Sequence, residues 1–209
     1  MRDKQIMTIG VISATALLVG GWFWLDSGNR DNDRFAYCRA SAIAGGAATI
    51  GGTFTLTDDT GAQVSDQQVF TKPSLLYFGY SFCPDVCPFD NSRNAEAIDL
   101  LDQQGIDAQP VFVSVDPKRD TPEVLSQYAD NLHEKMIGLT GSPENIAAAA
   151  KAWRVAYQVP DTEDEDYLVS HTTMTFLVLP EYGTVEFFSR DVTADEMADR
   201  VACYVQASD

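Results

Sequence analysis

The stretch Phe82-Cys83-Pro84-Asp85-Val86-Cys87-Pro88 decides the fold, because it places two thiols four positions apart directly after a short strand. The residues before it, Leu75-Leu76-Tyr77-Phe78-Gly79-Tyr80, form an apolar run of the length typical of a buried strand. Three residues separate the cysteines, whereas a redox pair on such a loop normally has two between them. The longer loop favours a metal held from both ends over simple dithiol chemistry.

A hairpin and a strand precede this loop, and helices and strands alternate after it, which predicts a thioredoxin-like α/β fold with an added N-terminal β-hairpin over residues 51–209. The expected helix caps include Thr121 and Ser142, each followed by proline, and a capping box that begins at Thr193. The expected elements are a hairpin of 53–57 with 62–65, strands over 74–80, 109–115, 172–179 and 184–189, and helices over 88–103, from 122, from 143 and from 194.

The N-terminal region predicts a membrane anchor. Residues Ile6 to Leu25 form an uncharged run of 20 residues, and such a helix spans about 30 Å. Residues 1–25 are therefore interpreted as an uncleaved transmembrane signal anchor with its N-terminus inside, and residues 26–50 as a linker. A cleaved signal peptide is the alternative, although the apolar run exceeds the usual length of that segment.

The charge of the chain excludes one class of partner. The formal net charge is −17 at pH 7, so we expect no binding to a phosphate backbone and no nucleic-acid partner. The acidic run from Asp161 to Asp166 is interpreted as a solvated loop, because it lacks the spacing of a calcium-binding loop.

Cys83, Cys87 and His171 are the candidate metal ligands. If Pro88 is the first helical residue, Cys87 is the N-cap, where the helix dipole favours a thiolate. His171 stands just before a predicted strand that neighbours the cysteine loop, whereas His133 is interpreted as a surface residue. Two thiolates and an imidazole suit copper in both oxidation states, and zinc accepts the same ligands. A structural disulfide or buried inert thiols are the simpler alternatives.

Several stretches of the chain resemble those of a known protein family. The chain resembles the Sco/SenC family of copper-binding assembly proteins for cytochrome c oxidase. The resemblance covers residues from about 51 to the C-terminus, and four stretches carry it: Gly51–Asp58, Tyr77–Pro88, Phe112–Pro122 and Ile137–Gly141.

The resemblance implies that Cys83, Cys87 and His171 bind copper, and that an anchor holds the domain on the periplasmic face of a bacterial inner membrane. The implied partners are the copper-bearing subunit of cytochrome c oxidase and other copper carriers or thiol reductants. It also places Asp116 and Asp120 beside the metal, whereas turn and helix-start chemistry explains both residues equally well.

The chain departs from the family pattern in two places. Ser170 stands where the family usually has an acidic residue before its histidine, which bears on the support of the imidazole. The helix after the cysteines also carries less leucine than is usual, which predicts a thinner apolar cover over the site.

The remaining cysteines suggest a structural bridge. Cys38 and Cys203 lie outside the motif, and an exported domain in an oxidising compartment allows them to pair; two unpaired thiols are the alternative. Oxidation would join Cys83 to Cys87, so a disulfide and a bound metal should compete there. Met174, inside a predicted strand, is expected in the core.

These observations favour a membrane-anchored copper chaperone that delivers copper to, or prepares, the copper site of a haem–copper oxidase, and not a turnover enzyme. The rival hypothesis is a thiol-disulfide oxidoreductase that uses Cys83 and Cys87 without metal and needs no histidine beside them. A peroxidase of the peroxiredoxin type is disfavoured, because the cysteines here are paired and the chain lacks the threonine-rich stretch that precedes the single cysteine of such an enzyme.

Overall fold

The computed structural model describes residues 34–39, 49–164 and 166–208. Two units are distinguished, residues 1–38 and 39–209. In the first, residues 34–38 form a turn in which the N–H of Cys38 donates to the carbonyl of Phe35 at 3.1 Å. The predicted anchor over residues 1–25 lies outside the described residues. Among the helices that are described, none has both the length and the apolar character needed to span a bilayer.

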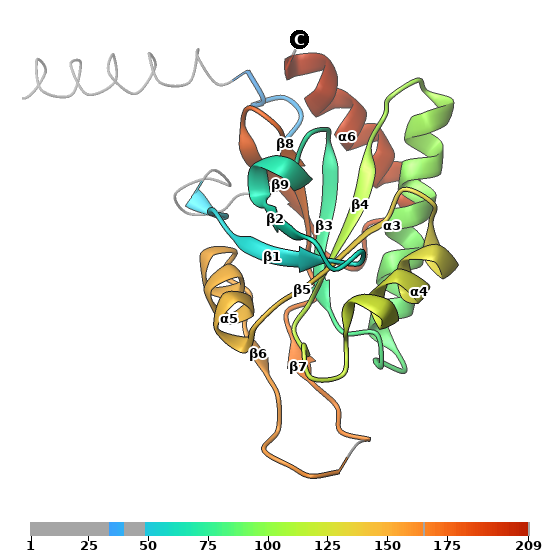
Figure 1. Cartoon of the computed structure of the whole chain (residues 1–209). Helices are drawn as coiled ribbons and strands as arrows, with labels where there is room; N and C mark the ends of the chain where they lie inside the picture. Colours follow the sequence, from blue (N-terminus) through green and yellow to red (C-terminus); the bar gives the residue numbers. More distant parts are fainter. Residues whose placement is uncertain (1–33, 40–48, 165, 209) are drawn as a thin grey trace, which may run out of the picture. The chain divides into compact units, whose positions relative to one another are not determined.

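A seven-stranded mixed sheet forms the centre of the second unit (Figure 1), in the order β2-β1-β5-β4-β3-β8-β9. β3, β4 and β5 run parallel to one another, whereas β1 runs antiparallel to β5 and to β2, β8 runs antiparallel to β3, and β9 runs antiparallel to β8. The strands of this sheet are β1 (Thr55–Asp58), β2 (Gln63–Ser65), β3 (Ser74–Gly79), β4 (Gln109–Ser114), β5 (Ile137–Thr140), β8 (Thr175–Leu179) and β9 (Gly183–Phe188).

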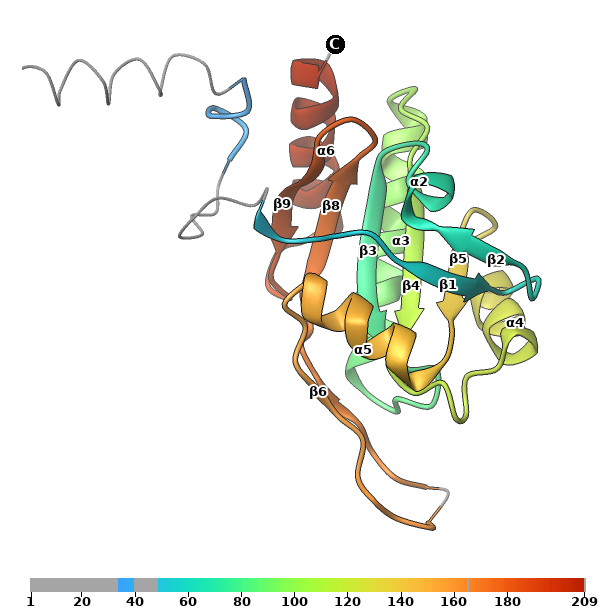
Figure 2. The same ribbon diagram turned by 60° about the vertical axis from the view of Figure 1, so that its left-hand side comes forward.

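Helices cover both faces of this sheet. Figure 2 shows α5 in front of the sheet, while α3 and α6 lie behind it. The predicted caps are confirmed, because Thr121 and Ser142 accept hydrogen bonds from the N–H groups of Val124 and Asn145. The helices are α2 (Asp66–Val69), α3 (Val86–Gln103), α4 (Pro122–Leu132), α5 (Pro143–Ala152) and α6 (Ala194–Ser208).

β3 is buried on both faces, as its apolar sequence predicted. Tyr77 points to the α3 side, where its hydroxyl donates to Asp90 at 2.9 Å. The next residue, Phe78, lies on the opposite side, with its ring centroid 6.3 Å from that of Trp153 at the end of α5. This alternation anchors the strand in two apolar layers and fixes the position of the loop that follows it.

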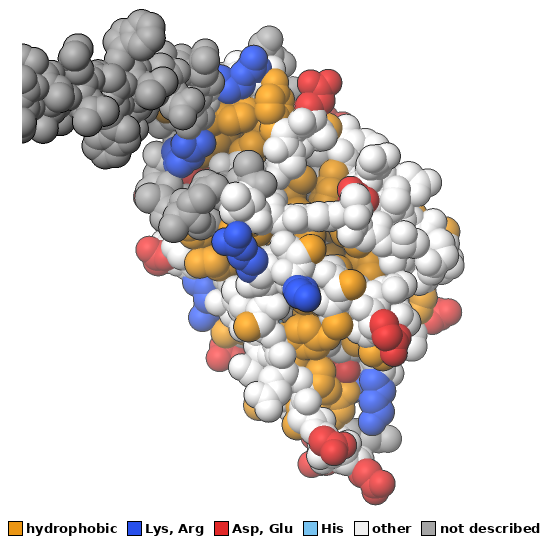
Figure 3. Space-filling view, turned by 90° about the vertical axis from the view of Figure 1, so that its left-hand side faces the viewer, with side chains coloured by type: hydrophobic (Ala, Val, Ile, Leu, Met, Phe, Trp, Pro, Cys, Tyr) orange, Lys and Arg blue, Asp and Glu red, His pale blue; other side chains and the backbone are white. Residues whose placement is uncertain are grey.

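A separate two-stranded ribbon extends from the sheet. β6 (Tyr157–Gln158) pairs antiparallel with β7 (Ser170–His171), and the hairpin between them extends beyond the rest of the unit in Figures 1 and 2. The prediction of one strand over 172–179 was therefore wrong at its start, because β8 begins at Thr175. Acidic side chains at the tip, seen at the bottom of Figure 3, are exposed, as predicted for this run: Asp161, Glu163, Asp164 and Asp166.

Candidate metal centre

Three separate elements bring the predicted ligands together. Cys83 lies in the loop after β3, Cys87 in the first turn of α3, and His171 in β7. One donor atom from each residue lies within 4.8 Å of the other two. Ligands around a single tetrahedral ion with bonds of about 2.0–2.3 Å stand about 3.5–3.8 Å apart. The S, S, N group is therefore compact enough for one metal ion after small side-chain adjustments.

The helix begins two residues earlier than predicted. α3 starts at Val86 with Asp85 as N-cap, so Cys87 is inside the first turn and the N-cap prediction for Cys87 was wrong. The N–H of Cys87 instead donates to the Sγ of Cys83 at 3.5 Å. Cys83 is therefore the cysteine whose thiolate the start of the helix stabilises.

The two thiols differ strongly as a result. Burial of Cys83 opposes its ionisation, but the backbone N–H groups of Cys87 and Asp85 outweigh burial and lower its pKa. For Cys87, which is 0% exposed, burial dominates and raises the pKa well above the ordinary value for a thiol. The metal-free site thus has one activated thiol and one protected thiol.

The imidazole of His171 presents its Nε2 to the cysteines, 3.3 Å from the Sγ of Cys87. Its Nδ1 lies 2.9 Å from the carbonyl oxygen of Thr172, which only accepts hydrogen bonds, so Nδ1 carries the proton. Burial lowers the pKa of His171, which favours the neutral ring with a lone pair on Nε2. The rings of Tyr77 and Tyr80 flank the imidazole edge-on, with centroids 6.0 and 5.8 Å away.

The support of the imidazole is thus a backbone carbonyl. Ser170, which replaces the family's acidic residue, is exposed in β7. The carbonyl of Thr172 performs the task that an acidic neighbour was expected to perform, because it fixes the tautomer and the orientation of the ring.

Gly79, the last residue of β3, makes room for Cys87. A Cβ atom there would lie 2.9 Å from the Sγ of Cys87, 2.9 Å from Tyr77 Cε1 and 3.0 Å from Phe112 Cε2. These distances are shorter than van der Waals contact, so any larger residue would displace the buried thiol.

Asp120 fixes the start of the cysteine loop. Its carboxylate is fully buried, and it accepts hydrogen bonds from the Ser81 N–H at 3.0 Å, from the Ser81 hydroxyl, and from the Ser114 hydroxyl at 2.5 Å. Burial raises its pKa, against the effect of these donors. None of these three hydrogen bonds involves Cys83, Cys87 or His171. Asp120 therefore acts on the site through Ser81, at the start of the cysteine loop.

Asp116 fixes the hairpin that carries His171. Its carboxylate accepts from the hydroxyl of Tyr167 at 2.7 Å and from Nε of Arg119 at 2.5 Å. The guanidinium of Arg119 lies over the Tyr167 ring, 3.6 Å from its centroid, and 5.0 Å from that of Phe82. Tyr167 was not identified from the sequence, since only the fold brings it into contact with Asp116, 51 positions away. Arg119 was not identified either, although it is only three positions from Asp116.

The face of α3 beneath the cysteines is polar and buried, in keeping with the low leucine content of this helix. Asp90 accepts from Tyr77 and from Arg190, the latter at 3.2 Å. Asn91 donates to the carbonyl of Cys87 at 2.9 Å and to the hydroxyl of Tyr128 at 3.2 Å. The helix turn that holds Cys87 is therefore fixed by hydrogen bonds from a buried polar side chain.

The other predictions have mixed outcomes. The side chain of His133 is only 8% exposed, with Nε2 3.3 Å from Asp99 Oδ1, so its assignment to the surface was wrong. Met174 packs against the core, as expected. Cys83 and Cys87 are free thiols, whereas Cys38 and Cys203 are both disulfide-bonded. The pairing of Cys38 with Cys203 stays a prediction.

Apolar side chains are exposed around the ligands. Phe82 and Phe89, which flank the cysteine pair, are 52% and 70% exposed, and Leu168 on the hairpin is 64% exposed. All three side chains stand within three positions of a candidate ligand in the sequence, so each is available to a molecule that approaches the site.

Comparison with known proteins identifies the family. The SCO1/SenC family model matches residues 43–206. Protein SenC of Rhodobacter capsulatus is 47% identical over 202 residues, which cover 97% of this chain and 86% of that protein. The human mitochondrial SCO1 homologue is 35% identical over 164 residues, covering 77% of this chain and 54% of that protein.

Solved structures agree with this match. Arabidopsis thaliana ScoI with copper bound has a TM-score of 0.71 and 42% identity, covering 75% of this chain and 99% of that one. Yeast Sco1 with copper bound has a TM-score of 0.71 and 33% identity, covering 76% of this chain and 89% of that one. The expected thioredoxin-like α/β fold is confirmed by this likeness and by the mixed sheet. The chain belongs to the SCO1/SenC family.

Proposed function

We propose that this protein is a membrane-anchored copper chaperone that loads or prepares the copper site of cytochrome c oxidase. Copper is its cargo, held by the Sγ atoms of Cys83 and Cys87 and by Nε2 of His171. The observation that supports this most strongly is the convergence of these three donor atoms within 4.8 Å. Soft thiolates retain Cu(I) and the imidazole accommodates Cu(II), so the same site serves both states of the ion.

The surroundings suit transfer of the cargo. The imidazole is on a ribbon and the thiols on a loop and helix start, so the site can open without unfolding the sheet. The exposed Phe82, Phe89 and Leu168 give a partner an apolar surface beside the ligands. The proposed partners are the copper-bearing subunit of the oxidase and the carriers or reductants that load or reset the site.

The proposed location is a bacterial inner membrane, with residues 1–25 as a single-pass anchor, residues 26–50 as linker and residues 51–209 facing the periplasm. The uncharged run Ile6–Leu25 supports the anchor. A disulfide between Cys38 and Cys203 is proposed to tie the linker to α6. Peptide mapping of unreduced protein should recover these two cysteines in one cross-linked peptide, and recovery of both in separate peptides would refute the pairing.

Transfer tests the chaperone function directly. The full chain, purified in detergent and loaded with Cu(I), is mixed with the copper-bearing subunit of cytochrome c oxidase, and copper is measured in each protein after separation. Copper should move to the subunit. If it stays on the chain, while a small-molecule Cu(I) chelator removes it readily, the protein is not a donor to that subunit.

A thiol reductase is the second candidate, and the unequal cysteines favour it as an additional role. The Cys83 thiolate would attack a disulfide in the partner, and Cys87 would then displace the partner thiol from the mixed disulfide. The products are a reduced partner and a Cys83–Cys87 disulfide, so two electrons pass to the partner. A His171→Ala variant should keep this metal-free reduction but lose copper binding.

A further inference from the structure

One guanidinium lies between the two parts of the chain that carry the metal ligands. Arg119 belongs to the turn after β4, outside both the cysteine loop and the hairpin of β6 and β7, and its side chain is only 12% exposed. Its Cζ lies 3.6 Å from the ring centroid of Tyr167 on the hairpin. The centroids of Phe82 and Tyr80, beside the cysteines, are 5.0 and 5.5 Å away. Arg119 therefore contacts the cysteine loop and the histidine hairpin at the same time.

The guanidinium is itself held in place from its own turn. Its Nε donates to the carboxylate of Asp116 at 2.5 Å, and the same carboxylate accepts from the hydroxyl of Tyr167 at 2.7 Å. The backbone N–H of Arg119 donates to the carbonyl of Asp116 at 3.2 Å. A planar cation that is already fixed in this way loses little further side-chain freedom when aromatic rings pack on it.

The rings that Arg119 contacts lie close to the imidazole. Tyr80 is edge-on to His171, with the two centroids 5.8 Å apart, and Tyr167 is four positions before His171 on the same hairpin. β6 and β7 pair over only two residues each, so the ribbon alone gives the hairpin little stability. The position of His171 relative to the thiols therefore depends on contacts between the hairpin and the rest of the fold.

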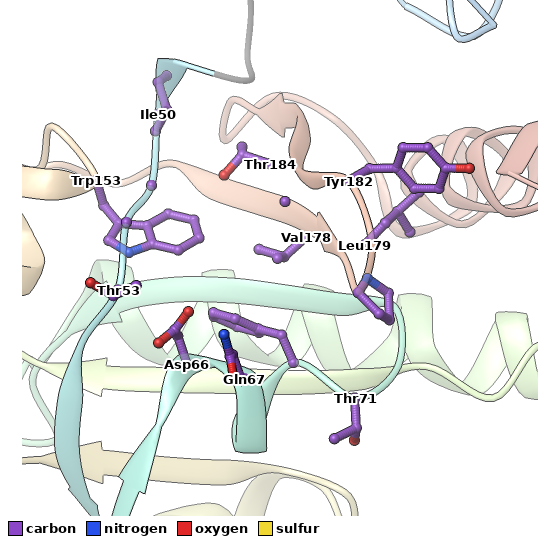
Figure 4. Close-up of a pocket in the computed structure, with 15 residues that line it drawn as sticks. Ile50, Thr53, Asp66, Gln67, Thr71, Trp153, Val178, Leu179, Tyr182 and Thr184 are labelled. Carbon is purple, nitrogen blue, oxygen red and sulfur yellow. The ribbon is translucent and has the colours of Figure 1, made fainter.

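The largest described cavity, of about 550 Å³, lies elsewhere in the fold (Figure 4). The described residues that line it include none of the three ligands, neither Arg119 nor the rings that it contacts. Val178, labelled in Figure 4, pairs with Ser74 at the start of β3, whereas the cysteine loop follows the end of that strand. A change at Val178 can therefore lower stability without reaching the metal ligands.

We propose that Arg119 is a positioning residue of the candidate metal centre. By packing the hairpin against the cysteine loop, it keeps the imidazole of His171 within reach of the two thiols. The planar guanidinium performs this task, and not the charge alone, because rings from two different segments lie against it. Only the metal readout of this proposal rests on the proposed copper function, and the metal-free protein tests it independently.

The metal-free test follows the ring of His171 by NMR, in the full chain in detergent. In the parent protein, nuclear Overhauser effects should connect its ring protons with those of Tyr77 and Tyr80, whose centroids are 6.0 and 5.8 Å away. Arg119→Met should abolish these effects, because the hairpin then moves away from the cysteine loop. The chain has two histidines, so His133→Ala identifies the signals of His171.

The metal readout tests whether Arg119 acts through His171. Arg119→Met should weaken copper binding about tenfold or more, to the level of His171→Ala. The double variant should bind copper as His171→Ala does, since the two changes then remove the same interaction and their effects do not add. Pulsed electron paramagnetic resonance of the Cu(II)-loaded chain should detect an imidazole nitrogen in the parent protein and none in Arg119→Met.

Three further variants separate positioning from a general loss of stability. Lys118→Met removes an exposed cation whose Nζ lies over the Tyr167 ring at 5.8 Å, and should leave the His171 contacts and the copper affinity unchanged. Val178→Ala truncates a side chain that is 3% exposed, so it should lower the unfolding temperature and change neither readout. Arg119→Lys keeps the positive charge and should still lose part of both readouts, because an ammonium does not lie flat against two rings.

The proposal is overturned if Arg119→Met keeps the His171 contacts of the parent protein, or if Arg119→Lys matches the parent in both readouts. It is also overturned if the effects of Arg119→Met and His171→Ala on copper binding add, or if Val178→Ala loses the His171 contacts as Arg119→Met does. If the parent protein itself binds no copper, the proposed function fails, and the contacts of His171 in the metal-free variants still decide the role of Arg119.

Discussion

The backbone N–H of Cys87 donates to the Sγ of Cys83 at 3.5 Å, so the start of α3 activates one thiol of the pair while burying the other. This relationship makes the two cysteines chemically distinct before any metal binds. The proposed reductase role depends on this difference, because it needs one thiol that attacks and one that resolves the mixed disulfide.

The first prediction concerns this difference. In the reduced, metal-free protein, iodoacetamide should modify Cys83 at least tenfold faster than Cys87, because Cys87 is 0% exposed and burial raises its pKa. Mass spectrometry of timed samples gives both rates.

Oxidation to the Cys83–Cys87 disulfide should abolish copper binding, since the metal needs both thiolates. Equal alkylation rates, or equal copper binding by the oxidised form, would contradict this account.

Gly79→Ala tests the close approach of β3 to the buried thiol. The new methyl group would lie 2.9 Å from the Sγ of Cys87, so we expect a loss of about 1–3 kcal/mol in the free energy of unfolding and a weaker copper site. Denaturant unfolding and a copper titration measure the two effects. Gly105→Ala is the control: its φ is 79°, but open space surrounds it, so it should reduce stability and leave copper affinity unchanged.

Tyr167→Phe tests the attachment of the hairpin that carries His171. The change removes the hydrogen bond to Asp116 and leaves the ring in place under Arg119, so stability should fall by about 1–2 kcal/mol. Hydrogen exchange should quicken in residues 158–170. Tyr157→Phe on the same ribbon serves as the matched control. Unchanged exchange in the hairpin of the Tyr167 variant would show that this bond does not hold it.

Asp120 gives a pH dependence of defined sign. Burial raises its folded-state pKa above the ordinary 3.8, so its favourable contribution is complete below that value and is lost as pH rises through the folded-state pKa. The stability advantage of the parent protein over Asp120→Asn should therefore shrink as the pH rises above the ordinary value of 3.8. Urea unfolding at several pH values measures it.

Asp107 supplies the control for that experiment. Hydrogen bonds from Lys72 and Lys135 lower its pKa, so any advantage over Asp107→Asn is present above pH 3.8 and is lost as pH falls through the folded-state pKa. The two variants should show opposite trends, and the Asp107 effect should be small because the pair is exposed. An advantage over Asp120→Asn that grows with pH would mean that its carboxylate is stabilised by the fold.

The sequence predicted much of this fold because its signals are local. The proline-marked caps of α4 and α5 and the apolar run of β3 depend on neighbouring residues alone. β5, by contrast, is a strand of only four residues and was not identified, and the short ribbon of β6 with β7 depends on pairing across a long hairpin. Patterns within one segment do not reveal such pairings.

The three candidate ligands could be picked out from the sequence, whereas the residues that support them could not. The spacing of Cys83 and Cys87 identifies them as a candidate pair, and the position of His171 just before a predicted strand identifies it as the third candidate. The sequence does not show that the N–H groups at the start of α3 favour Cys83, because that depends on a helix boundary two residues from the predicted one. Nor does it show that Tyr167 contacts Asp116.

The measurement that tests the central claim most directly is the visible spectrum of the full chain, in detergent, loaded with Cu(II). Thiolate ligation should give charge-transfer absorption at one copper per chain. His171→Ala should change this spectrum and weaken copper binding at least tenfold, while His133→Ala, which alters the other histidine of the chain, should leave both unchanged. If His171→Ala retains the parent spectrum and affinity, His171 is not a ligand and the proposed copper site is wrong.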